Sequence, residues 1–96
     1  MQYITVITDI VVKNGYVEVM KQELLKLVEP TRNEYGCILY EFYQDINNPL
    51  LFRSYEKWIN MEVIERHLNT NYIKNYMTNT KNITEYFKIN YFKKLI

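Results

Sequence analysis

Few side chains in this sequence can do acid–base or nucleophilic chemistry near neutral pH. Its 96 residues include one histidine, His67, one cysteine, Cys37, and one serine, Ser54. One histidine and one cysteine cannot supply the four nitrogen and sulfur ligands of a structural zinc site. A Ser–His–Asp triad would have to use Ser54 and His67, and neither lies in the sequence context that such a site shows. His67 is therefore the candidate acid or base, because an imidazole changes charge between about pH 5 and pH 8.

The composition argues against several other functions. Two glycines are too few for a phosphate-binding loop or a dinucleotide fingerprint, so we expect no nucleotide cofactor and no metal. Twelve Lys and Arg against eleven Asp and Glu leave a net charge of +1, which gives no overall field to attract nucleic acid or a membrane surface. No apolar run approaches the roughly 18 residues of a membrane span, and the N-terminus lacks the basic region of a signal peptide. The single cysteine suits a reducing compartment, so we expect a cytoplasmic protein.

The hydrophobic pattern predicts the elements that must position His67. Four strands are expected over residues 2–12, 37–45, 50–58 and 83–93, and a helix over residues 16–29. Pro30 removes a backbone donor, so we expect a kink or a looser turn to Tyr35, with Gly36 in the position that ends the helix. Asn60 and Thr70 can each cap a further short helix.

This order, β-α-β-β-α-β, predicts a ferredoxin-like α+β fold with a four-stranded antiparallel sheet, and residues 1–96 are expected to form one domain. Helices then cover one face of the sheet only. The first strand is nevertheless apolar on both faces, with Val6 and Ile10 on one and Ile7 and Val11 on the other. A second subunit packed sheet against sheet would cover the open face, so we expect a homodimer.

Three short motifs give a resemblance to a known family. Residues 31–41 (TRNEYGCILYE) resemble the T-R-x-E-x-G-C-x-x-Y-E signature of the antibiotic biosynthesis monooxygenase (ABM) domain family. Residues 56–58 (EKW) are similar to its E-x-W motif, and residues 67–70 (HLNT) to its H-L-x-[ST] motif, in the expected order. The break at residues 13–15 also fits, and the likeness extends over residues 3–92.

The resemblance implies a ferredoxin-like fold that dimerises into a shared α/β barrel. Characterised relatives include cofactor-independent monooxygenases of quinols and polycyclic anthrones, haem-degrading enzymes, and a group that processes a small bacterial signalling molecule. The haem-degrading relatives use an asparagine on the first strand, a tryptophan on the second helix and a histidine further along as iron ligand. Here the first strand has no asparagine, the helix position carries His67, and no second histidine exists, so haem degradation is disfavoured.

We therefore expect a cofactor-independent monooxygenase or related oxidoreductase that uses O2 on a small aromatic quinol or phenol. Once deprotonated, such a substrate can pass an electron to O2, so the protein needs only a base, donors to the developing oxyanion, and a dry aromatic pocket. His67 is the expected base or proton shuttle, and Glu56 the residue that orients it. The expected substrate-binding residues are Trp58, Tyr72, Tyr40, Tyr76 and Arg32.

Each of these residues also has a purely structural interpretation. His67 can be a buried histidine satisfied by one carbonyl or carboxylate, and Trp58 and the tyrosines can be core. Arg32 can tie the first helix to the hairpin through Glu41 or Glu56. Glu34 also flanks the helix end, where most such charged residues are structural, and Cys37 is interpreted as a small core residue.

The alternative function is a non-catalytic dimeric module of the same fold that binds a small ligand. A pocket that encloses His67 and Trp58 with room for a bicyclic ring would favour an enzyme or ligand binder. A filled core would favour the module.

Overall fold

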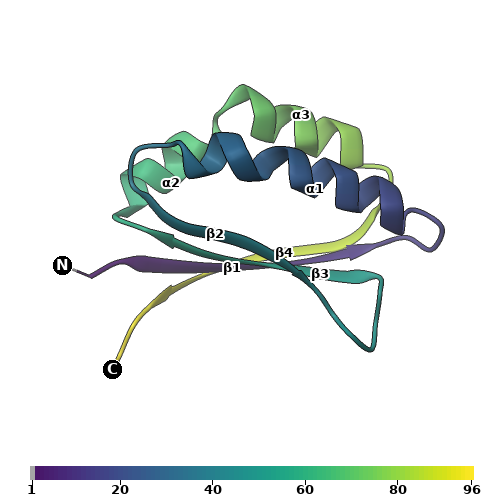
Figure 1. Ribbon diagram of the computed structural model, residues 1–96, viewed down its shortest axis with the longest axis horizontal. Coiled ribbons are helices and arrows are strands. Elements are labelled where there is room, and N and C mark those ends of the chain that lie inside the picture. Colours follow the sequence, from purple (N-terminus) through teal and green to yellow (C-terminus); the bar gives the residue numbers. More distant parts are fainter. Residues whose placement is uncertain (1) are drawn as a thin grey trace.

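The computed structural model describes residues 2–96, and the fold within that range is the expected ferredoxin-like α+β arrangement (Figure 1). The elements in chain order are β1 (Ile4–Val12), α1 (Val17–Arg32), β2 (Cys37–Gln44), β3 (Leu51–Trp58), α2 (Met61–Leu68), α3 (Asn71–Thr80) and β4 (Thr84–Lys93). The strands form one antiparallel sheet in the order β2-β3-β1-β4. All three helices lie on the same side of the sheet.

The strand register places several site residues side by side. Glu56 of β3 is paired with Tyr40 of β2 on one side and with Val6 of β1 on the other. Because side chains alternate along a strand, these three point to the same face, which is the face under the helices. Ser54, two residues before Glu56, shares this face, and its hydroxyl accepts a hydrogen bond of 3.1 Å from the Thr8 amide.

The end of α1 differs from what the sequence led us to expect. The helix continues through Pro30 to Arg32, and Asn33 is its C-cap. Proline is tolerated there because it lies in the last turn, where its ring removes one hydrogen bond without stopping the helix. Gly36 does not end the helix, although its φ of +88° is left-handed. It lies against α2 instead, since a Cβ at this position would be 2.9 Å from both γ carbons of Val63.

The two short helices begin where their caps predict. The Asn60 side chain accepts a hydrogen bond of 3.0 Å from the Val63 amide, and the Thr70 hydroxyl accepts one of 3.4 Å from the Ile73 amide. Thr70 also donates to the His67 carbonyl at 2.8 Å. The end of α2 is thereby held against the start of α3. Among residues 2–96, no helix is both long and apolar enough to cross a membrane.

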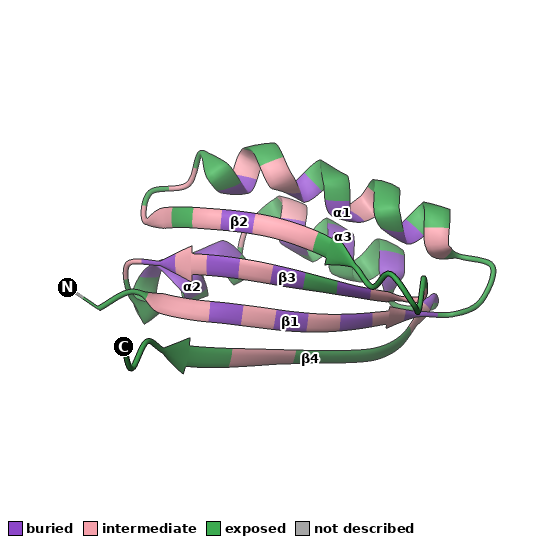
Figure 2. Ribbon diagram, turned by 60° about the horizontal axis from the view of Figure 1, so that its bottom comes forward, coloured by how far each residue is buried: buried purple, intermediate pink, exposed green. Residues whose placement is uncertain are grey.

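The opposite face of the sheet is not covered by any element within residues 2–96 (Figure 2). Apolar side chains on that face include Ile7 and Val11 of β1, which are half-buried, and Phe92 of β4, which is exposed. One ion pair, between Asp9 and Arg53, lies among them. The two-sided apolar character of the first strand is thus present in the structure, and the homodimer stays a prediction.

The two glycines allow a matched test of the contact between the α1–β2 turn and α2. Both have left-handed φ values, +91° at Gly15 and +88° at Gly36, but a Cβ added at Gly15 would meet no atom within 4 Å. We expect Gly15→Ala to lower the free energy of unfolding by about 1–2 kcal/mol, the backbone penalty alone. Gly36→Ala should cost about 2–4 kcal/mol, because the clash with Val63 adds to that penalty. Urea denaturation of both variants checks this, and equal losses would contradict the proposed close approach.

Candidate functional site

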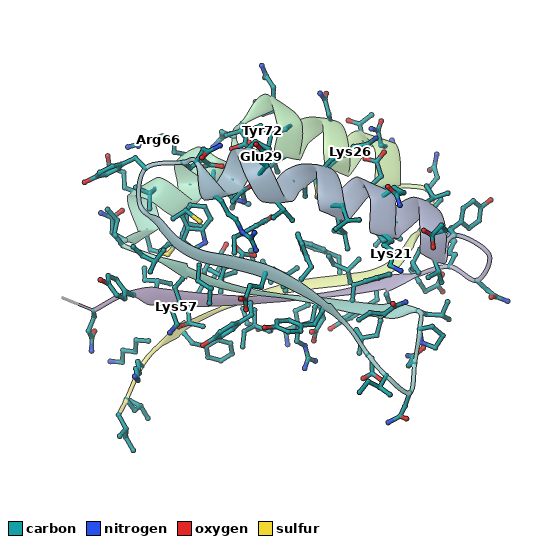
Figure 3. All side chains as sticks on the ribbon, viewed as in Figure 1. Lys21, Lys26, Glu29, Lys57, Arg66 and Tyr72 are labelled. Carbon is teal, nitrogen blue, oxygen red and sulfur yellow. The ribbon has the colours of Figure 1, made fainter. Side chains whose placement is uncertain are left out.

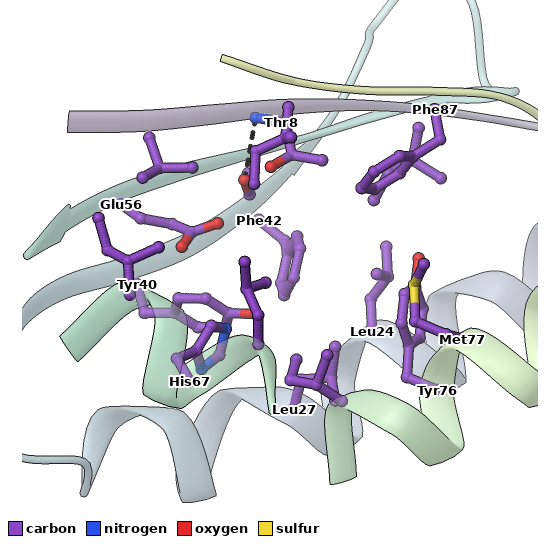
Figure 4. Close-up of a pocket in the computed structure, with 17 residues that line it drawn as sticks. Thr8, Leu24, Leu27, Tyr40, Phe42, Glu56, His67, Tyr76, Met77 and Phe87 are labelled. Atoms are coloured by element: carbon purple, nitrogen blue, oxygen red, sulfur yellow. Dashed lines mark hydrogen bonds between the residues drawn. The ribbon is translucent and has the colours of Figure 1, made fainter. Parts of the chain in front are cut away.

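A cavity of about 60 Å³ lies between the helices and the sheet. Figure 4 shows Glu56, Tyr40 and His67 at one end of it, and Leu24, Met77 and Phe87 at the other. The cavity therefore has a polar end and an apolar end. The histidine and a carboxyl group that the sequence suggested for acid–base chemistry meet at the polar end.

His67 is the last residue but one of α2, and only 4 % of it is exposed. Its Nδ1 lies 2.7 Å from Oε2 of Glu34, which is in the turn between α1 and β2. The Tyr72 hydroxyl, from α3, donates to the same oxygen. The α1–β2 turn, α2 and α3 therefore meet at one carboxylate.

This contact corrects the sequence-based expectation that Glu56 orients His67. Glu34 contacts the ring instead, although the sequence analysis gave Glu34 no functional role. A signal was present, since Glu34 lies in the T-R-x-E-x-G-C motif two residues before Gly36. The sequence did not show that Gly36 would bring this turn against α2.

Two aromatic rings fix the position of the imidazole. The Trp58 ring is tilted against it with centroids 4.7 Å apart, and Tyr40 approaches edge-on at 5.6 Å. Tyr40 lines the cavity. Trp58 is fully buried behind His67 and does not line the cavity, so in this structure it is a support for the imidazole.

Glu56 is a buried carboxyl, 6 % exposed, that lines the cavity. Its Oε1 accepts a hydrogen bond of 2.9 Å from the Trp58 indole. Burial raises the pKa of Glu56, and hydrogen bonds from Ser54 and Trp58 oppose that rise. Burial disfavours the charged carboxylate, so Glu56 holds its proton to a higher pH than an exposed glutamate does. Shifted carboxyl pKa values in a cavity are typical of functional sites, although structural networks produce them too.

The other predicted residues lie in different places. Tyr76 lines the cavity, and its hydroxyl donates to the Met20 sulfur at 3.7 Å. Tyr72 lies outside the cavity lining, in the helix layer (Figure 3), where it holds Glu34. Arg32 is also outside. Its guanidinium donates two hydrogen bonds, of 2.9 and 3.1 Å, to the Tyr40 carbonyl, so it ties α1 to β2 without using Glu41 or Glu56.

Cys37 has the environment of a structural thiol. Burial raises its pKa to about 11, and the nearby carboxylates of Glu34 and Glu56 add to the rise. The thiolate is the nucleophilic form, so this cysteine is poorly suited to attack a substrate. Within residues 2–96, no group of three or more His, Cys, Asp or Glu side chains is placed to hold a metal ion.

The volume of the cavity bears on two alternatives. An enzyme or ligand binder needs room for a ring, whereas a non-catalytic module can have a filled core. An engineered cavity of about 150 Å³ binds benzene, and this one is well below that. It has room for water or for a molecule of the size of O2. A ring enters only if the walls move apart. Met77 and Phe87 at the apolar end are 48 % and 43 % exposed, so that end is the part with least packing around it.

The fold and the site together define a class: a ferredoxin-like α+β domain with a buried histidine and a buried carboxyl between helices and sheet. The sequence model of the family described as Antibiotic biosynthesis monooxygenase matches residues 3–79. This chain belongs to that family, as the motifs at residues 31–41 and 67–70 indicated.

Solved structures share the fold. PA3566 from Pseudomonas aeruginosa is 30 % identical, with a TM-score of 0.96 over 100 % of this chain and 97 % of that one. A conserved protein from Methanosarcina mazei is 26 % identical, with a TM-score of 0.91 over 99 % of this chain and 95 % of that one. Among curated proteins, an uncharacterised protein from Synechocystis is 34 % identical over 61 residues, which is 59 % of this chain and 42 % of the relative. The match thus spans less than half of that relative's length.

The raised pKa of Glu56 gives a test of its burial. A buried carboxyl that favours its neutral form stabilises the fold fully below its ordinary pKa of 4.5, and this stability is lost as the pH rises through the raised folded-state value. A glutamine cannot ionise and still accepts a hydrogen bond from Trp58. We therefore expect Glu56→Gln to become progressively more stable relative to the parent protein as the pH rises above about 4.5.

The measurement is urea denaturation of both proteins at several pH values. Glu62→Gln is the control, because the Glu62 side chain is 80 % exposed and no burial opposes its charge. A stability difference between Glu56→Gln and the parent that does not change with pH would show that Glu56 is as well solvated as Glu62.

Proposed function

We propose that this protein is a cofactor-independent monooxygenase, or a related oxidoreductase, that acts on a small quinol or phenol with O2. The observation that carries the proposal is that His67 and Glu56 both line the polar end of an otherwise apolar cavity. Membership of the Antibiotic biosynthesis monooxygenase family supports the reaction class. The fold alone would not, because one fold hosts many activities. The single cysteine suits the reducing cytoplasm, which we propose as the location of the protein.

The chemistry needs no bound cofactor because the substrate supplies the electrons. Removal of the hydroxyl proton gives a phenolate, which transfers one electron to O2 to form a substrate radical and superoxide. The two recombine into a carbon–oxygen bond at a ring carbon that carries hydrogen, and the peroxide anion takes back the proton to give a hydroperoxide. Loss of water then leaves a carbonyl group on that carbon. One oxygen atom of O2 enters the product, the other leaves as water, and the organic molecule supplies the remaining electrons.

Each protein group has a role in this sequence that follows from its position. The imidazole of His67 takes the hydroxyl proton, because it lines the cavity and has no rival base there of comparable ordinary pKa. Glu56, which burial keeps protonated to a higher pH, donates a hydrogen bond or a proton to the developing oxygen anion. Tyr40, whose hydroxyl pKa is also raised by burial, is a further donor. The apolar end excludes water from the radical pair.

A second candidate function is a dimeric module of the same fold that binds a small ligand without catalysis. The small volume of the cavity favours it, because about 60 Å³ of space is close to a filled core. The bond between His67 and Glu34 is compatible with it, since a buried histidine satisfied by a carboxylate is a common structural arrangement. Activity of His67 variants separates the two candidates.

We expect His67→Asn to slow quinol-dependent O2 consumption by roughly 100- to 10,000-fold, the usual contribution of a positioned acid or base. Asparagine removes the basic nitrogen but keeps an N–H that can donate to Glu34, so the variant should remain folded. His67→Ala should show the same loss of rate, together with a loss of about 1–3 kcal/mol because the Glu34 carboxylate loses a donor.

Oxygen-electrode rates and melting temperatures on both variants provide the measurement. Tyr76→Phe is the matched control, because it removes a polar group from the same cavity without removing a base. An active His67→Asn protein would leave the histidine with a structural role only and would favour the binding module.

We also propose that the chain is a homodimer that buries the helix-free face of the sheet. Ile7, Val11 and Phe92 on that face are apolar, and no element within residues 2–96 covers them. A domain of this size exposes a large share of its surface when alone, and stable obligate interfaces bury about 2,000 Å² or more in total. The helix side is not an equivalent surface, because charged residues such as Lys26 and Arg66 lie on its outside (Figure 3).

Light scattering at micromolar concentration is expected to give twice the chain mass of 11.8 kDa. Ile7→Lys should shift the protein toward the monomer, because a lysine in the centre of an apolar interface is desolvated without a partner. Leu25→Lys is the control, since Leu25 is 56 % exposed on α1, on the other side of the molecule. A monomer mass for the parent protein would overturn the proposal.

A further inference from the structure

The carboxylate of Glu34 is placed to control which ring nitrogen of His67 carries a proton. Oε2 of Glu34 lies 2.7 Å from Nδ1 of His67 and also accepts the hydroxyl of Tyr72. The side chain of Glu34 is 16 % exposed, against 4 % for His67. The contact therefore lies on the side of the imidazole turned away from the cavity, toward the surface of the helix layer.

The direction of these hydrogen bonds follows from the chemistry of the groups. Burial, with the hydrogen bond to Glu34, raises the pKa of Tyr72 to about 12, so its hydroxyl keeps its proton and donates. Oε2 is then an acceptor, and a ring nitrogen that faces an acceptor at 2.7 Å must donate. In a neutral imidazole only one nitrogen carries hydrogen. A proton on Nδ1 leaves Nε2 with a free lone pair.

The groups around the imidazole hold the ring in place. Trp58 and Tyr40 pack against the imidazole, and Thr70 donates to its backbone carbonyl. Nε2 has no hydrogen-bond partner among residues 2–96, and it is not one of the fully enclosed polar atoms that lack a partner. His67 lines the cavity, so an unbonded ring nitrogen is available on the residue that borders it.

The remaining titratable groups around His67 do not compete for Nδ1. Glu56 from β3 accepts the indole N–H of Trp58, and burial raises its pKa. Tyr40 from β2 keeps its hydroxyl proton because burial raises its pKa. Of the groups that face the ring, Glu34 is the one in contact with Nδ1.

We propose that Glu34 and Tyr72 are positioning residues that fix neutral His67 in the tautomer with hydrogen on Nδ1 and so present an unprotonated Nε2 to the cavity. Free histidine in water prefers the opposite tautomer, so the protein imposes this one. The catalytic use of Nε2 rests on the proposed function. The tautomer itself does not, because it exists without substrate.

The single histidine makes the tautomer directly measurable. In protein labelled with ¹⁵N-histidine, every imidazole signal belongs to His67, and the ¹⁵N shifts of the neutral ring distinguish the two tautomers. We expect the parent protein to show a protonated Nδ1 and an unprotonated Nε2. Glu34→Gln should shift the population toward a protonated Nε2, because the amide can donate to Nδ1. Tyr72→Phe should shift it less, since the carboxylate remains.

Glu41→Gln is the matched control. Glu41 also accepts a tyrosine hydroxyl, that of Tyr43 at 2.6 Å, but this pair is exposed on β2. Its replacement should leave the ring spectrum unchanged. A parent protein with hydrogen on Nε2, or a Glu34→Gln spectrum identical to that of the parent, would overturn the proposal. If Glu34→Gln does not fold, the spectrum of the parent protein still decides which tautomer is present. An unchanged spectrum of Tyr72→Phe would then overturn the positioning role of Tyr72.

An activity measurement separates this inference from the proposed function. Glu34→Gln should slow quinol-dependent O2 consumption by a factor between about 10 and 10,000. The upper value is the loss seen in a Ser–His–Asp triad when an amide replaces the carboxylate that orients the histidine. It should also change the pH profile of the rate, which a loss of packing would not do. If the tautomer changes as expected but His67→Asn is active, the positioning inference stands and the proposed function fails.

Discussion

The geometry of the site depends on one oxygen of Glu34, which accepts hydrogen bonds from both His67 and Tyr72. A partly buried carboxylate is costly unless donors surround it, and here α2 and α3 each provide one. The helix α2 has eight residues, too few to be stable in isolation, so it needs such tertiary contacts. The close approach of Gly36 to Val63 brings the α1–β2 turn near enough for the carboxylate to reach.

The two glutamates at the site have different roles because they have different surroundings. Glu34 lies toward the surface and accepts hydrogen bonds from an imidazole and a phenol. Glu56 lies deeper, on β3, where burial raises its pKa and favours the neutral form. One residue type thus provides an acceptor behind the histidine and a donor in the cavity.

The cavity places a constraint on any substrate. Its polar groups are gathered at one end, so a ligand with one hydroxylated end and an otherwise apolar body fits the arrangement of side chains (Figure 4). Its volume of about 60 Å³ means that a ring must displace side chains on entry. Met77 is a suitable residue to yield, because a methionine side chain is unbranched and flexible. The cavity lining, within residues 2–96, contains no lysine or arginine, so the donors available to a developing oxygen anion are hydroxyl, carboxyl and imidazole groups.

The sequence by itself determined the elements and the residue on which acid–base chemistry depends. Alternation and helical spacing are local patterns, and the caps at Asn60 and Thr70 act within three residues, so these could be read from the chain alone. The scarcity of ionisable side chains near neutral pH singled out His67, and the motifs indicated the family. The continuation of α1 through Pro30 was missed, because a proline in a last turn and a proline that stops a helix look alike in sequence.

Only the tertiary structure decided which carboxylate serves His67 and which residues face the cavity. Glu34 lies 33 residues before His67, so no local pattern in the sequence could show this contact. The outcome depends on how close α2 comes to the α1–β2 turn, and that distance is set by the absence of one side chain at Gly36. Similarly, Trp58 and Arg32 lie outside the cavity. The strand register places Trp58 against His67, and the packing of α1 directs Arg32 to the Tyr40 carbonyl. Periodicity determines which face a side chain occupies, but contacts between distant segments follow from packing, which no local pattern encodes.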